Sequence, residues 1–266
     1  MPQKRRVANK KSDDEARFQI RSLALNCPSG YEIHSHSHEW HQLIYASRGA
    51  MSINTANGSL VVPSKRAVWM PAGITHEIEM IGAVSMRTLY LKPDLNGKLP
   101  KHCHVIEVTP LLRELILHII GVGMLDRNVP SQRRLIGVIA DQLSAVAAVP
   151  LKLPMPNDAR ALRVAETLRE SPGDTTSLTH LSRKAGASKR TIERLFQAET
   201  EMSFGKWRQQ MRLLHALRLL ALGESVTTAA LEVGYDSTSA FIAAFKTVLG
   251  KTPGQYYADS RNQTNS

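Results

Sequence analysis

"LTHLSRKAGASKRTIERLF", residues 178–196, and "VTTAALEVGYDSTSAFIAAF", residues 226–245, are two copies of one pattern. They superpose on Gly186 and Gly234, with apolar or small residues at matching positions before each glycine. A glycine that can adopt positive φ, followed by a serine that can cap the next helix, is typical of a sharp turn between two helices. The repeat therefore predicts two helix-turn-helix units.

The second helix of each unit is predicted to expose a polar face. In the first unit, Ile192, Leu195 and Phe196 fall on the buried side at helical spacing. The candidate DNA contacts of this unit are Ser188, Lys189, Arg190, Glu193, Arg194 and Gln197. Those of the second unit are Ser237, Thr238, Ser239, Ile242 and Lys246. Such side chains reach phosphates and base edges in a major groove, and the two serines also cap their helices.

Residues 203–223 predict one long helix between the units, with Trp207, Met211 and Leu214 on its buried side. At about 1.5 Å per residue it would be on the order of 30 Å long. Successive major-groove faces on one side of B-DNA are about 34 Å apart, so one helix can hold two recognition helices in adjacent groove segments. The alternative is a plain helical bundle with a solvated face, but two matched units in a chain of formal net charge +11 favour double-stranded DNA as the partner.

"GYDSTSAFIAAFKTVLGKTPGQYY", residues 234–257, resembles the C-terminal signature of AraC/XylS-type bacterial transcription regulators. The matching positions are Phe245, Lys246, Gly250, Pro253 and Tyr256. The resemblance covers residues 158–257 and implies two helix-turn-helix units that bind asymmetric DNA sites. This chain has Ala243 where the family often has an arginine, so we expect the first recognition helix to carry most of the base specificity.

The N-terminal half predicts a β domain. Short apolar runs separated by Gly, Pro, Asn and Ser extend from Phe18 to Leu91, which is typical of a sandwich or barrel. Helical spacing follows in residues 110–120 and 131–149, and these helices either cover an open end of the β domain or form a dimer contact. Three prolines between 150 and 156 then predict an extended linker.

Histidines and glycines in this half follow the spacing of two cupin motifs. Gly30, His36, His38 and Gln42 match the first motif, and "PAGITH", which ends at His76, matches the second. The resemblance implies a cupin-like domain that binds a small effector, and Gln42 replaces the usual glutamate. Three imidazoles and an amide oxygen suit one divalent transition metal such as Zn, Ni, Mn or Fe, although the same residues also suit hydrogen bonding to an effector without metal.

Other histidines receive different interpretations. His34 is a candidate neighbour of the ligands, and His41 is out of phase with the ligand face and is interpreted as structural or as part of the rim. The run 102–104, His-Cys-His, is interpreted as a solvated strand end because its members alternate faces.

The fold class expected is α+β with two domains: a cupin-like β-barrel with following helices, and an all-α domain with two helix-turn-helix units joined by a long helix. The predicted parts are a disordered basic tail at 1–17, a cupin-like effector-binding and dimerisation domain at 18–148, a proline-rich linker at 149–157, the double helix-turn-helix domain at 158–258 and a tail at 259–266.

Two functions remain open at this point. The favoured one is a DNA-binding transcriptional regulator, not an enzyme, controlled by a small effector or metal; the alternative is a metal-dependent, dioxygenase-like cupin enzyme with an attached DNA-binding module. A glutamine in place of a carboxylate weakens the enzyme interpretation. The resemblance favours an activator, which makes RNA polymerase a candidate partner, and a homodimer is expected. With no apolar run long enough for a membrane span and only two cysteines, the sequence predicts a cytoplasmic protein.

Overall fold

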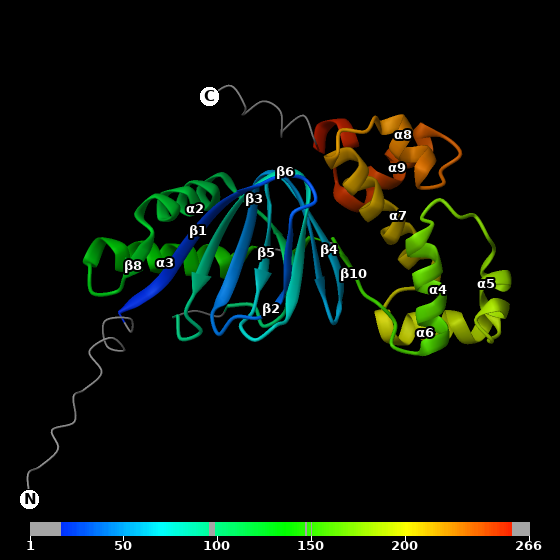
Figure 1. The fold of residues 1–266 in the computed structure, drawn as a ribbon, viewed down its shortest axis with the longest axis horizontal. Coiled ribbons are helices and arrows are strands. Elements are labelled where there is room, and N and C mark those ends of the chain that lie inside the picture. Colours follow the sequence, from blue (N-terminus) through cyan, green and yellow to red (C-terminus); the bar gives the residue numbers. More distant parts are fainter. Residues whose placement is uncertain (1–16, 96–98, 147, 150, 257–266) are drawn as a thin grey trace, which may run out of the picture.

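The structure, a computed structural model, describes residues 17–95, 99–146, 148–149 and 151–256 (Figure 1). The predicted tails 1–17 and 259–266 lie outside the described residues, apart from Arg17. Within the described ranges, no helix is both long and apolar enough to cross a membrane.

The N-terminal half is a β-sheet with two helices. The strands are β1 (Phe18–Cys27), β2 (Glu32–His36), β3 (His41–Thr55), β4 (Gly58–Pro63), β5 (Arg66–Met70), β6 (His76–Leu91), β7 (His104–Glu107), β8 (Met124–Asp126), β9 (Ala148–Val149) and β10 (Lys152–Leu153). The helices are α2 (Pro110–Val122) and α3 (Pro130–Ala145). These strands belong to one sheet of order β8-β1-β6-β3-β5-β7-β9, with β2 paired to β6, β4 to β3 and β10 to β4.

The long strands β3 and β6 form the centre of the sheet and separate two apolar clusters. Alternate residues of β3 face opposite sides: Leu43 and Tyr45 join the cluster covered by α2 and α3, whereas Ile44 and Ala46 face the inside of the curved sheet. The register of β3 against β6 shifts on both sides of Arg48, next to Gly49. This irregularity bends both strands and curls the sheet.

The expected barrel is not closed. The main path of the sheet ends at β8 and β9, and among the described strands no pairing joins these two, so the domain keeps open edges where a barrel would have none. Helices α2 and α3 cover the outer face of the curved sheet rather than an open end of the domain (Figure 1). Leu111, Val122 and Val138 of these helices stay exposed.

The second predicted helix and the linker differ in detail from expectation. Helix α3 ends at Ala145 rather than continuing to residue 149, and β9 pairs with β7 instead. A proline at position 150 disfavours helix for Val149, and the pairing of β9 with β7 takes Ala148 and Val149 into the sheet. Of the predicted linker, residues 151–157 contain no helix, and Lys152–Leu153 form β10, which pairs with β4.

The C-terminal half is helical, as predicted. Its helices are α4 (Ala159–Glu170), α5 (Leu178–Lys184), α6 (Lys189–Thr200), α7 (Phe204–Ala221), α8 (Val226–Glu232) and α9 (Thr238–Leu249). The pairs α5–α6 and α8–α9 are the two helix-turn-helix units, and both turn glycines have positive φ. Ser188 and Ser237 cap α6 and α9, which confirms those predictions. Trp207, Met211 and Leu214 are buried on α7.

Helix α7 also contacts the sheet, along β4 and β10 and at β3 and β6. As a result, the buried apolar residues inside the curved sheet and those of the helical domain form one continuous cluster. Figure 1 shows the helical domain beside β4 and β10, at the end of the sheet away from α2 and α3.

We predict that Gly49→Ala destabilises the fold more than Gly30→Ala. Both glycines have φ near +75°, so an alanine at either position costs the same backbone strain, about 1–2 kcal/mol. A Cβ at Gly49 would lie 2.4 Å from the carbonyl oxygen of Ala83 on β6, whereas one at Gly30 meets no atom of the described residues within 4 Å. Urea unfolding followed by circular dichroism measures both losses, and equal losses would contradict the close approach of β3 to β6.

Candidate functional site

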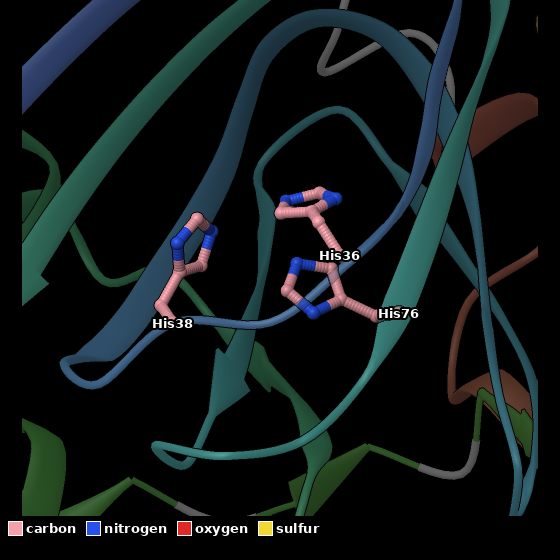
Figure 2. A group of neighbouring side chains, drawn as sticks. All are labelled: His36, His38 and His76. Atoms are coloured by element: carbon pink, nitrogen blue, oxygen red, sulfur yellow. The ribbon is translucent and has the colours of Figure 1, made fainter.

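Three histidines meet on the inner face of the sheet (Figure 2). His36 ends β2, His38 follows in the connection to β3, and His76 begins β6 directly opposite His36. Their ring centroids are 4.4 Å apart for His36 and His76, and 4.7 Å apart for His36 and His38. One ligating nitrogen from each ring lies within 4.8 Å of the others. The sequence-predicted imidazoles are thus brought together.

Backbone carbonyls orient two of these rings. Nδ1 of His36 donates to the carbonyl of His34 at 2.6 Å, and Nδ1 of His76 donates to the carbonyl of Ile74 at 3.0 Å. A protonated Nδ1 leaves the lone pair on Nε2, and this arrangement is typical of histidines that ligate metals. His34, predicted as a neighbour of the ligands, contributes through its main chain.

Three buried polar atoms at this site have no hydrogen-bond partner among the described residues: Nε2 of His38, Nε2 of His76 and Oε1 of Gln42. Nε2 of Gln42 donates to the hydroxyl of Thr88 at 3.1 Å, and this bond leaves Oε1, the carbonyl oxygen of the same side chain, without a partner. Buried polar atoms are rarely left unpaired. All three belong to residues predicted as ligands, and a lone pair on each suits a cation or a donor group of a ligand.

Gln42 faces the same side of the sheet as the histidines. It pairs with Tyr90 across β3 and β6, and the ring of Tyr90 contacts the ring of His38 at 5.0 Å between centroids. Gln42 is therefore connected to His38 through Tyr90, on the same side of the sheet.

Burial keeps two of the imidazoles neutral. It lowers the pKa of His38, and the nearby charge of His36 lowers that pKa further. Burial also lowers the pKa of His76, partly offset by the carbonyl of Ile74. Because metals bind the neutral imidazole, these shifts favour the form that ligates.

The residues present fit a divalent metal. Two ligand atoms that are each about 2.1 Å from one ion lie at most about 4.2 Å apart, so a nitrogen pair at the 4.8 Å limit would have to close by at least about 0.6 Å. Three neutral imidazoles and a neutral amide would leave the charge of the ion at +2. A metal held there would attract an anionic or chelating ligand.

A cavity of about 620 Å³ opens beside His38. Its lining includes Arg21, Ser37, His38, Trp40, Tyr90 and Met124. The guanidinium of Arg21 stacks on the ring of Trp40 at 4.7 Å, and the ammonium of Lys92 lies 5.9 Å from the same ring. Glu39 also lines the cavity, which thus combines aromatic walls with charged groups of both signs.

The remaining histidines of this half lie apart from the cluster. Nδ1 of His41 accepts from the backbone N–H of Ala72, and its ring packs near Trp69, which is a structural role. In the run 102–104, Nδ1 of His104 donates to the carbonyl of His102. Among the described residues, neither His41 nor His104 belongs to a group of three or more potential ligands.

The predicted DNA contacts lie on the exposed sides of α6 and α9. All six residues of the first set are exposed, and Lys189 forms an ion pair with Glu193 one turn later at 3.8 Å. In the second set, Ser237, Ser239 and Lys246 are exposed, but Ile242 is partly buried against the core. Helix α9 therefore presents a smaller polar face than α6.

Arg212 joins the loop between α4 and α5 to the turn of the second helix-turn-helix unit, a role that the sequence did not predict. From α7, its guanidinium donates to the carbonyls of Pro172, Asp174 and Gly234 at 3.0 to 3.3 Å. Gly173 approaches Gly234 closely beside it: a Cβ on either glycine would lie 2.6 Å from a backbone oxygen. Nothing in the sequence distinguishes an arginine that binds three backbone carbonyls from any other arginine on an amphipathic helix.

Comparisons with known proteins agree with both halves of the chain. Residues 181–259 match the Helix-turn-helix domain family, and residues 22–143 match the AraC-like ligand binding domain family. The HTH-type transcriptional regulator NimR of Escherichia coli strain K12 is 35% identical over 223 residues, which cover 84% of this chain and 81% of NimR.

One further regulator and one solved structure are also similar to this chain. The HTH-type transcriptional regulator RipA of Corynebacterium glutamicum is 39% identical over 104 residues, 39% of this chain and 31% of RipA. The crystal structure of ToxT from Vibrio cholerae aligns over 92% of this chain and 99% of its own, at 10% identity and a TM-score of 0.40.

A double helix-turn-helix domain attached to a ligand-binding sheet domain defines a DNA-binding transcriptional regulator. This chain belongs to the AraC family of such regulators.

We predict that Arg212→Met lowers the free energy of unfolding by about 1–3 kcal/mol, because the carbonyls of Pro172 and Gly234 lose this donor. Arg183→Met, at an exposed position of α5, is the matched control and should cost less than about 0.5 kcal/mol. Thermal and urea unfolding measure both. A loss for Arg212→Met no larger than that of the control would contradict the bridging role.

Proposed function

We propose that this protein is a transcriptional regulator whose N-terminal domain binds a divalent transition metal through His36, His38, His76 and Gln42. The observation that carries the proposal is the set of buried, unpaired polar atoms of His38, His76 and Gln42 within the described ranges, together with three imidazoles that converge within 4.8 Å. When bound, the metal supplies positive charge and coordination positions for a ligand. The protein residues hold it, orient it and line the approach.

The effector of this site is a metal ion alone or a metal with a chelating anion. A neutral ligand set leaves the positive charge of the ion uncompensated, and Arg21 and Lys92 add positive charge around the adjoining cavity. The aromatic walls of Trp40 and Tyr90 suit an effector with an apolar part. Differential affinity of the effector for two states of the domain then changes DNA binding.

Sensing explains the site better than catalysis does. Non-haem iron oxygenases rely on a carboxylate beside two histidines, and the proposed set contains an amide instead. The family relationship supports activation of transcription, with RNA polymerase as a partner, and the exposed apolar residues of α2 and α3 support a homodimer.

At the DNA, α6 is proposed to supply base readout and α9 mainly backbone and thymine-methyl contacts. Arg190 and Arg194 are exposed and can bind guanine edges in a bidentate manner, whereas α9 has the small side chain Ala243 at the corresponding place. Lys189 and Lys246 are suited to phosphates.

We predict near-stoichiometric metal in the purified, untagged protein and its loss from the His36→Ala and His76→Ala variants. His34→Ala is the matched control, since its side chain is exposed and the carbonyl that orients His36 remains. Elemental analysis measures the metal content. Absence of metal from the parent protein, also after exposure to Zn²⁺ and Ni²⁺, would refute the metal site and leave a hydrogen-bonding effector pocket.

We predict that Arg190→Ala and Arg194→Ala relax sequence preference by about 1–3 kcal/mol at the base pair each contacts. Lys189→Ala should instead weaken binding to all sequences and reduce the salt-dependence slope by about one. An operator selected in vitro from random DNA by the wild type provides the reference site. Arg134→Ala, exposed on α3, is the control, and unchanged preference in both arginine variants of α6 would contradict the assignment.

A further inference from the structure

The histidine site and the DNA-binding domain lie on opposite faces of the same two strands. On the inner face, His36 of β2 and His76 of β6 stand opposite each other. Three residues further along β6, Glu79 stands opposite Glu32 of β2. The register shift between these two rungs lets β2 present a histidine inward and a carboxylate outward.

The outer face of this strand pair holds helix α7. Arg218 of α7 donates two hydrogen bonds to the carboxylate of Glu79, at 2.8 and 2.9 Å. Near the end of the helix, the backbone of Ala221 approaches Gly82 of β6, where an added Cβ would lie 3.4 Å from the Ala221 oxygen. Helix α7 thus follows β6 from Glu79 to Gly82.

The ion pair is placed so that its strength can change. The side chains of Arg218 and Glu79 are 31% and 39% exposed, so solvent screens the pair and its own contribution is small. A cavity of about 320 Å³ lies beside it, lined by residues of both domains that include Asn54, Glu79, Arg169 and His215. The cavity leaves this corner of the contact incompletely packed, so the ion pair can change while the apolar contact of α7 with β4 and β10 is kept.

Strand β2 determines the charge around Glu79. Among the described strands it pairs with β6 alone and is five residues long, so it is an edge strand held by one neighbour. When β2 is held on β6, the carboxylate of Glu32 is fixed opposite Glu79, and Glu77 lies on the same face. Three carboxylates strengthen the attraction for Arg218, whereas a frayed β2 removes one of them.

We propose that Glu79 and Arg218 form an interdomain latch, which the His36–His76 rung tightens when its two strands are joined by a bound metal. This inference rests on the proposed function, because it assigns the regulation of that site. A ligand that holds His36 against His76 fixes β2, fixes Glu32 beside Glu79, and holds α7 on the sheet. Because α7 packs against both helix-turn-helix units, fixing α7 on the sheet fixes the position of both units and thereby changes the affinity for the operator.

The test compares the operator affinity of the full-length protein with and without saturating Zn²⁺, alongside hydrogen–deuterium exchange of β2. We expect Zn²⁺ to slow exchange in β2 in every variant that keeps the histidines. In the wild type it should change the operator Kd by about 5-fold or more, and in Arg218→Gln by less than about 2-fold. Arg169→Gln removes a charge from the same cavity without touching the ion pair, and should respond like the wild type.

A charge-reversed pair controls for misfolding. Glu79→Arg alone should lose the Zn²⁺ response, and Glu79→Arg combined with Arg218→Glu should regain part of it. A Zn²⁺ response in Arg218→Gln equal to that of the wild type, with β2 still protected, would overturn the latch and leave the metal site intact. No protection of β2 and no change in operator Kd in the wild type would overturn the proposed function, and the latch with it.

Discussion

Helix α7 is the element on which the rest of the helical domain depends. One side of it is buried against both helix-turn-helix units, and the linker is fixed to its first turn by the bond from Trp207 to the carbonyl of Pro154. Its 18 residues correspond to about 27 Å, so the spacing of α6 and α9 follows from its length. Because the same helix lies on the sheet, any shift of that contact moves both recognition helices together.

The sequence was most informative where contacts are local. Each helix-turn-helix unit occupies one short continuous segment, and a period of about 3.6, a glycine with positive φ and a serine cap all lie within it. The repeat could therefore be aligned, its caps named and its buried residues identified from spacing alone. The convergence of His36, His38 and His76 was also predictable, because a cupin-like spacing specifies two strands that come together.

Non-local features could not be obtained in the same way. The sheet stays open because β8 and β9 do not pair with each other among the described strands, and no residue pattern encodes which strands form the edges. The pairing of β10 with β4 turns a predicted linker into part of the sheet. Arg212 and the pair Glu79–Arg218 join residues far apart in the chain, and an arginine on an amphipathic helix looks the same whether it meets solvent, a carbonyl or a carboxylate.

A β-strand is a suitable carrier of a signal between these domains because its side chains alternate faces. His76 points to the inside and Glu79 to the outside, and at about 3.3 Å per residue they are only about 10 Å apart along β6. An event on the inner face thus reaches the outer face without repacking the apolar cluster between the long strands. What moves is a short strand at the margin, where pairing is weak, and what responds is a solvent-screened ion pair. Both parts change state at small energetic cost, so a single bound effector suffices to bias them.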